Sequence, residues 1–183
     1  RKESSAASDV YKRQRTYSQP FLLLLLIPFS LTTVAWGHLV HGFPVNVISL
    51  LGVIALVGIL VNDGLVLISK FNSNLRAGKS YDESLFGAGK ERFRAIFLTS
   101  ITTMAGLAPI IFEKSFQAQL LKPMAISIAY GIGYATFLTL ILLPILLSLT
   151  NTFKLNFVWL RSGKKLDKRE VEAPVIELKR EKK

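Results

Sequence analysis

The sequence contains no cysteine and only two methionines, Met104 and Met124. The missing cysteines leave the redox compartment open, and so few thioethers give no support to a soft-metal path. A nucleophile–base constellation, metal-ligand spacing and a phosphate loop of the form GxxxxGKS/T are also missing. The sequence therefore predicts neither an enzyme nor a cofactor or metal site.

Charge is almost absent from four long stretches, although the 183 residues include 23 basic and 12 acidic side chains. A globular protein distributes its charges along amphipathic helices with a period of about 3.6 residues. Here charged and apolar residues are separated in blocks, which is typical of a protein that crosses a membrane several times. The net charge of +11 comes from segments that flank these stretches. It therefore predicts contact with membrane lipid and no nucleic-acid partner.

The apolar stretches predict four transmembrane helices, at residues 21–40, 45–69, 95–112 and 123–149. The first covers 20 residues without a formal charge, about 30 Å as a helix and enough to cross a bilayer core. Its apolar core is longer than that of a cleavable signal peptide, so it is a real span. The predicted fold class is an all-α, polytopic membrane helix bundle.

The distribution of basic residues predicts the orientation of the spans. The connection HGFP between the first two spans has no lysine or arginine, and residues 113–122 have two. Residues 70–94 carry six, and the chain from residue 150 onward carries ten. Because basic residues accumulate on the cytoplasmic side, both chain ends and the 70–94 connection are expected in the cytoplasm.

The segments outside the spans predict one further helix and two flanking regions. Ser80-Tyr81-Asp82-Glu83 has the S-x-x-E form of a capping box, so a helix is expected to begin at Tyr81 and continue into the third span. Residues 1–14 are polar, resemble a translated linker stretch and are interpreted as non-native. The four-span domain is expected at 15–152, and 153–183 are expected to form a basic, mostly disordered cytoplasmic tail.

Asp63 is the only formally charged residue between positions 45 and 69. An ionisable side chain inside a span costs several kcal/mol on insertion scales and usually has a function. Apolar surroundings disfavour the anion, which allows a carboxyl group to exchange a proton near neutral pH. Lys70 lies two turns away and is free to reach the headgroups. The residues alone leave two roles open for Asp63, a proton relay or a hydrogen-bonded contact between helices.

Small residues in the fourth span predict close helix packing. Two rows have four-residue spacing: Ala125, Ala129 and Gly133, and Ser127, Gly131 and Ala135. Such rows let another helix approach closely.

Other polar residues of the spans have mainly structural interpretations. At least two hydroxyls of the third span are expected to bond to carbonyl groups of their own helix; the candidates are Thr99, Ser100, Thr102 and Thr103. His38 and Trp36, near the end of the first span, are interpreted as interfacial anchors.

Three segments together carry a family resemblance: SLLGVIALVGILVNDGLVLISKFN, then KERFRAIFLTSITTMAGLAPIIF, then QLLKPMAISIAYGIGYATFLTLILLPILLSL. Their order, spacing and topology resemble the C-terminal part of a resistance-nodulation-division (RND) efflux permease of the acriflavine-resistance type. The resemblance covers residues 15–152 and matches the ninth to twelfth of the family's twelve spans. It implies a proton antiporter of the bacterial inner membrane, a homotrimer with a periplasmic adaptor and an outer-membrane channel. It also implies that the N-terminal half of the permease lies outside this chain.

The resemblance assigns a proton relay to four residues. Asn62 and Asp63 occupy the position in the tenth span where such permeases often have a lysine that pairs with two carboxylates of the fourth span. Asn62 stands in place of that lysine, so an Asn–Asp pair is expected to share the proton. Thr99 matches a threonine that hydrogen-bonds into the relay, and Arg92 matches an arginine at its cytoplasmic entrance.

Two alternatives to an export permease remain open at this point. One is a related exporter or translocation accessory protein of the same superfamily, which would carry different periplasmic domains. The other is a free-standing four-span assembly protein without transport activity, with a native start near Arg15.

Overall fold

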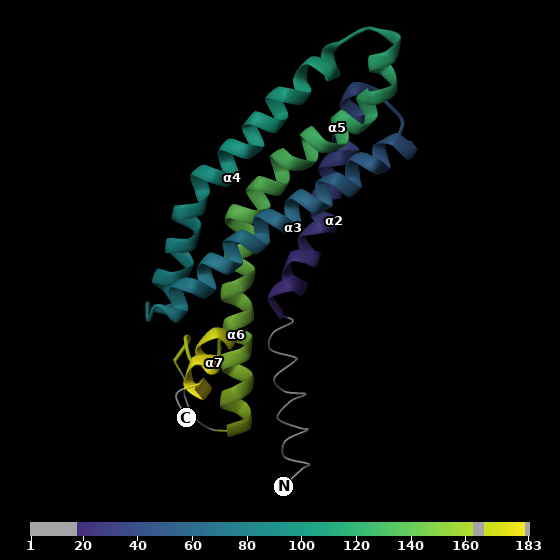
Figure 1. Cartoon of the computed structure of the whole chain (residues 1–183). Helices are drawn as coiled ribbons and strands as arrows, with labels where there is room; N and C mark the ends of the chain where they lie inside the picture. Colours follow the sequence, from purple (N-terminus) through teal and green to yellow (C-terminus); the bar gives the residue numbers. More distant parts are fainter. Residues whose placement is uncertain (1–17, 163–166, 182–183) are drawn as a thin grey trace.

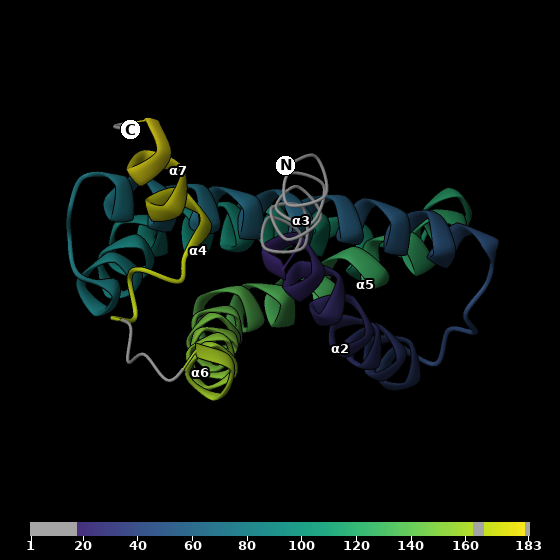
Figure 2. The same cartoon turned by 90° about the horizontal axis from the view of Figure 1, so that it is seen from below.

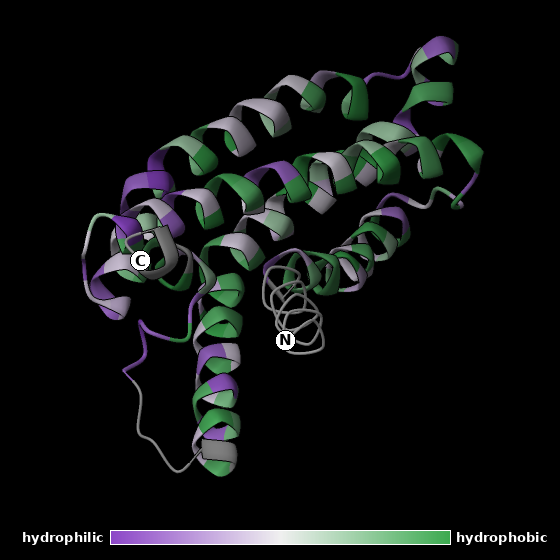
Figure 3. Ribbon diagram, turned by 60° about the horizontal axis from the view of Figure 1, so that its bottom comes forward, coloured by the Kyte–Doolittle hydropathy of each residue, from purple (hydrophilic) through white to green (hydrophobic). Residues whose placement is uncertain are grey.

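The computed structural model describes residues 18–162 and 167–181 of the chain. Four apolar helical segments in these ranges are long enough to cross a membrane: Gln19–His41, Val47–Arg76, Tyr81–Phe112 and Phe116–Leu160. Short turns connect them, so that successive helices run in opposite directions (Figure 1). Hydrophobic residues dominate along the helices, and hydrophilic residues gather near their ends (Figure 3). The predicted all-α bundle of four transmembrane helices is confirmed.

The first two helices are α2 (Ser18–His41) and α3 (Val47–Arg76). Asn46 caps α3, because its side chain accepts a hydrogen bond from the Ser49 N–H at 2.9 Å. The Ser49 hydroxyl oxygen in turn accepts from the Asn46 N–H at 3.2 Å. Gly42, in the turn before this cap, has a φ of +68°, which glycine adopts without the steric cost of a Cβ atom.

Helix α4 (Tyr81–Phe112) begins at the predicted capping box. Ser80 Oγ accepts from the Glu83 N–H at 3.3 Å, and Glu83 Oε2 accepts from the Ser80 N–H at 3.1 Å. The helix then continues without interruption through the third predicted span. The predicted start at Tyr81 and the continuation into the span are both confirmed.

The fourth span is longer than the sequence predicts. α5 (Phe116–Phe137), the π-helical segment η1 (Leu138–Leu142) and α6 (Leu143–Ser162) follow one another without a break. The helix begins earlier because Ser115 caps it, with its side chain accepting from the Ala118 N–H. Its direction changes where η1 lies (Figure 1), as expected where a π segment interrupts the regular helical ladder.

Helix α5 contacts α2, α3 and α4, and the view from below shows α2 and α4 on different sides of the α3–α5 pair (Figure 2). Glycines bring α3 and α5 together. A Cβ atom at Gly52 would lie 2.7 Å from the carbonyl oxygen of Met124, and one at Gly131 would collide with Leu56. The row of Ser127, Gly131 and Ala135 is buried and permits the close approach that its spacing predicts.

Beyond residue 152, the described residues include further helix. α6 continues to Ser162, and α7 (Ala173–Glu181) lies against the end of α3. Val171 and Val175 are buried, and the carboxylate of Glu172 accepts a hydrogen bond from Asn151 Nδ2 at 2.8 Å. The charged composition of this segment does not indicate that these few residues are packed. The interpretation of residues 1–14 as non-native falls outside the described ranges.

Candidate functional site

Asp63 lies near the middle of α3, 16 residues after Val47 and 13 before Arg76, or about 24 and 20 Å along the helix. Its side chain is half-buried, at the edge of the packed face that contains Leu60 and Leu67. Among the described residues, no hydrogen bond or ion pair involves its carboxyl group. Asp63 is therefore a mid-span acid whose partner is not found in the part of the chain described.

Asp63 and Lys70 lie on one face of α3, and the contact made by Lys70 identifies a helix that this face approaches. Instead of reaching the headgroups, Lys70 Nζ lies 2.6 Å from Glu91 Oε2 of α4. Residues seven apart share a helix face, so Asp63 lies on this face between Leu56, which packs against Gly131 of α5, and Lys70, which pairs with α4. Counting seven residues along both antiparallel helices from the Lys70–Glu91 pair brings Asp63 to the level of Leu98, next to Thr99.

Thr99 is exposed and bonds within its own helix. Its hydroxyl lies 3.1 Å from the Ala95 carbonyl oxygen and 2.9 Å from that of Ile96. The expectation that at least two hydroxyls of this span bond to their own helix is confirmed for all four, because the others donate to the carbonyl oxygen four residues earlier: Ser100, Thr102 and Thr103. Ser100 also forms a hydrogen bond with Thr136 of α5.

Arg92 and Asn62 complete the predicted set. Arg92 lies seven residues before Thr99, on the same face of α4, and its buried Nε has no hydrogen-bond partner among the described residues. Asn62 is exposed, whereas Asp63 is half-buried. No hydrogen bond or ion pair in the described ranges joins any two of the four predicted relay residues. By this residue count, Asp63 and Thr99 lie at a similar depth, and Arg92 lies two turns nearer the α3–α4 turn.

His38 differs from its interpretation as an interfacial anchor. Its side chain is only 2% exposed and lies between α2 and α5, with Nε2 hydrogen-bonded to Ser127 Oγ at 3.0 Å and Nδ1 to the Phe43 carbonyl oxygen at 3.2 Å. Trp36, by contrast, is exposed. Ser127 belongs to the small-residue row of the fourth span, which indicates a helix contact there without naming His38 as the partner.

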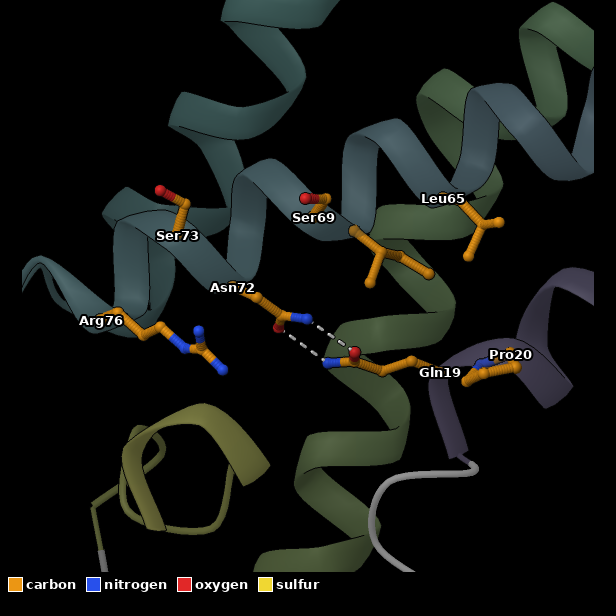
Figure 4. A pocket seen from close by; sticks show the side chains of 8 residues that line it. Gln19, Pro20, Leu65, Ser69, Asn72, Ser73 and Arg76 are labelled. Carbon is orange, nitrogen blue, oxygen red and sulfur yellow. Dashed lines mark hydrogen bonds between the residues drawn. The ribbon is translucent and has the colours of Figure 1, made fainter. Parts of the chain in front are cut away.

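A second polar contact that the sequence does not reveal joins α2 to α3 (Figure 4). The side-chain amides of Gln19 and Asn72 bond to each other twice, at 3.0 and 2.9 Å. Ser69, Ser73 and Arg76 line the same cavity of about 480 Å³. By helical position these residues lie on a face of α3 away from Asp63, so this cavity is separate from the predicted relay.

A comparison of the sequence with known protein families identifies the family of this chain. Residues 13–151 match the model of the AcrB/AcrD/AcrF family, a range that contains all four predicted relay residues and extends from α2 into the first half of α6. The chain belongs to the AcrB/AcrD/AcrF family. The resemblance to RND permeases that the three sequence segments carry is thereby confirmed.

Curated relatives of this AcrB/AcrD/AcrF member include proteins with different stated roles. Nickel and cobalt resistance protein CnrA of Cupriavidus metallidurans is 32% identical over 124 residues, 68% of this chain and 12% of CnrA. Swarming motility protein SwrC of Bacillus subtilis is 29% identical over 136 residues, 74% of this chain and 13% of SwrC. Multidrug resistance protein MdtC of Serratia proteamaculans is 26% identical over 153 residues, 83% of this chain and 15% of MdtC. The chain thus spans less than a sixth of the length of these relatives.

Proposed function

We propose that this chain contributes the C-terminal membrane part of a proton-driven RND export permease, and that Asp63 is one of its proton-binding residues. The observation that carries the proposal is the position of Asp63. A carboxyl group in the middle of a span, without a hydrogen bond or ion pair among the described residues, needs a proton or a partner from elsewhere. In the proposal that partner is a residue of the permease outside this chain.

Thr99 and Asn62 support Asp63 in different ways. Thr99 lies at the depth of Asp63 on the helix that Lys70 contacts through Glu91, and its hydroxyl oxygen has a free lone pair for a donor from outside its helix. Asn62 carries both a donor and an acceptor but no charge. The relay therefore transfers a proton through hydrogen bonds with the Asn62 amide, where other permeases would use a lysine charge.

Arg92 is proposed to act at the cytoplasmic entrance of the relay. Its Nε is buried without a hydrogen-bond acceptor among the described residues, which is costly for a charged donor. A carboxylate or water that enters during proton release would satisfy this group. The position two turns from Thr99 suits an entrance between the membrane surface and Asp63.

The assembly and location belong to the proposal as well. RND permeases act as homotrimers in the inner membrane, together with a periplasmic adaptor and an outer-membrane channel. The chain ends and the α3–α4 turn are proposed to face the cytoplasm, because the basic residues gather there. The names of the relatives refer to metals, drugs and swarming, so the substrate class is left to the porter domains of the whole protein.

The decisive experiment replaces Asp63 with asparagine in the full-length permease. Asp63→Asn keeps the size and hydrogen-bonding capacity of the side chain but removes its titration. Proton-driven export, measured as substrate efflux from energised vesicles, should fall by at least about tenfold if one step of the relay is lost. Cross-linking should show an unchanged trimer.

Asp167→Asn is the matched control, because Asp167 is an exposed aspartate outside the spans. It should leave export within about twofold of the parent, as expected for a surface substitution away from the relay. Near-normal export in Asp63→Asn, with the same trimer yield, would make Asp63 a structural residue and remove the basis of the proposal.

A further inference from the structure

Lys122 is a buried cation near the end of the bundle that the α2–α3 and α4–α5 turns form (Figure 1). It is the seventh residue of α5, and only 7% of it is exposed. Ala125, Ile126 and Ala129 follow it at the spacing of one helix face, and all three are buried. The lysine therefore belongs to the packed face of α5 and not to its surface.

The ammonium group of Lys122 lies over an aromatic ring. Its Nζ is 5.8 Å from the centroid of Phe43, which is half-buried in the α2–α3 turn. Among the described residues, Lys122 has no hydrogen bond and no ion pair. The attraction of a cation to a ring is weak compared with the cost of burying an unpaired charge. The contact with Phe43 therefore does not account for a lysine at this position.

Polar side chains near Lys122 are occupied by one another. His38 of α2 bonds to Ser127 of α5, and His41 bonds to Tyr130 one turn further along the two helices. These bonds join α2 to α5 and do not include the ammonium group of Lys122.

The described carboxylates do not reach Lys122 either. Glu113, nine residues earlier, is exposed in the α4–α5 turn and accepts hydrogen bonds from the next two main-chain N–H groups, at 2.8 and 3.1 Å. Gly52 of α3 lies against Met124 of α5, and Asp63 is eleven residues beyond Gly52, about 16 Å further along α3. The remaining acidic residues of the described ranges lie toward the α3–α4 turn. A partner for Lys122 must therefore come from outside this part of the chain.

The burial of Lys122 favours a protein side chain over a lipid headgroup as that partner. A lysine that binds headgroups extends its ammonium group to the membrane surface, whereas Lys122 is enclosed between α5 and the α2–α3 turn. The chain covers only 12–15% of the curated relatives, so most segments of the complete protein are not among its neighbours here. A carboxylate held by such a segment would compensate the buried charge.

We propose that Lys122 is the docking point for an acidic side chain of the permease segments outside this chain. The carboxylate forms an ion pair with Nζ beside Phe43 and so joins α5 to a segment that this chain lacks. The inference rests on the chain being a piece of a longer permease. It does not depend on proton transport or on Asp63.

Thermal unfolding of Lys122→Met tests the proposal in two proteins, the full-length permease and this chain alone, both in an uncharged detergent. Methionine keeps an unbranched side chain and removes the charge. In the full-length permease the unfolding midpoint should fall by about 2 °C or more, because a buried carboxylate loses its partner. In the chain alone it should rise by about 2 °C, because an unpaired buried charge is removed.

Lys114→Met is the matched control, since Lys114 is an exposed lysine at the same end of the bundle. It should change the midpoint by less than about 1 °C in both proteins. An unchanged midpoint for Lys122→Met in the full-length permease, or an equal fall in both proteins, would overturn the proposal. If Lys122→Met destabilises the chain alone only after phosphatidylglycerol is added, a lipid phosphate is the partner and the acidic side chain is wrong.

Carbodiimide cross-linking of the full-length permease tests the chemistry of the partner. The reagent condenses a lysine amine and a neighbouring carboxylate into an amide with loss of water. Mass spectrometry of the digest should find Lys122 joined to an aspartate or glutamate from outside this chain. Lys70 and Glu91, 2.6 Å apart, provide the internal positive control. Formation of the Lys70–Glu91 product without a product at Lys122 would overturn the carboxylate as the partner.

Discussion

At the residue scale, several polar side chains of the spans have partners on other helices, whereas Asp63 has none among the described residues. His38 bonds to Ser127, Ser100 to Thr136, and Gln19 to Asn72. Each of these contacts satisfies a group that would be costly to leave unpaired in an apolar environment. An acidic side chain in the middle of a span that lacks such a contact among the described residues is therefore a candidate for proton binding and not for a packing role.

A double-mutant cycle measures the contact between His38 and Ser127. His38→Ala and Ser127→Ala should each lower the thermal stability of the detergent-solubilised protein, and the double variant should lose less than their sum. The expected coupling is about 0.5–2 kcal/mol, the range for hydrogen bonds between membrane helices. Thr32 is exposed and bonds only to its own helix, so a His38→Ala, Thr32→Ala cycle should be additive. Additive losses for His38 and Ser127 would contradict the contact.

At the scale of helices, α3 and α5 form the most closely packed pair, and α4 is the least buried of the four candidate spans. Glycine at positions 52 and 131 removes the side chains that would hold α3 and α5 apart. α4 contacts α3 near the α3–α4 turn through Lys70–Glu91 and contacts α5 through Ser100. Its remaining apolar surface is available to lipid or to further helices of the permease.

Substitutions at two glycines of α3 distinguish the effect of helix packing on stability from the effect of intrinsic helix preference. Gly52→Ala would put a Cβ atom 2.7 Å from the backbone oxygen of Met124, which cannot move without shifting α5. It should destabilise the protein by about 1–3 kcal/mol. Gly58→Ala meets nothing within 4 Å and should be neutral or stabilising by up to about 1 kcal/mol. Unfolding in mixed detergent measures both, and equal effects would contradict the close α3–α5 contact.

At the scale of the whole molecule, the end of the bundle next to the α3–α4 turn is held together by the C-terminal segment. Lys168 pairs with Asp82 of α4, Arg169 donates to the Leu75 carbonyl oxygen at the end of α3, and Glu172 binds Asn151 and Lys154 of α6. These contacts join three helices at the side that carries most of the basic residues. The family match ends at residue 151, so this arrangement lies largely outside the matched region.

The absence of cysteine makes the orientation testable with single introduced thiols. Lys79→Cys lies in the turn between α3 and α4, and Lys114→Cys lies in the exposed turn between α4 and α5. In intact cells, an impermeant maleimide should label position 114 and leave position 79 unlabelled, because basic connections face the cytoplasm. Labelling at 79 but not at 114 would reverse the orientation. Labelling of both after permeabilisation is the accessibility control.

Features that depend on local chemistry can be predicted from the sequence alone. Four spans follow from the lengths of the apolar stretches, and the start of α4 follows from Ser80 and Glu83, which lie within one turn of each other. Asp63 stands out for the same reason, as one charge in a long apolar segment. Such features need no knowledge of which helices meet, because the hydrophobic effect and the capping bonds act within the segment itself.

Which faces of the helices meet is known only from the three-dimensional packing. The burial of His38 against Ser127, the pairing of Lys70 with Glu91 and the docking of Glu172 on α6 join positions 89, 21 and 21 residues apart. The direction of the chain through η1 and α6 likewise depends on contacts with α2 and α3. The physical reason is that lipid and water act on each span alike, whereas the rotation and crossing of helices are set by small residues and polar contacts between them.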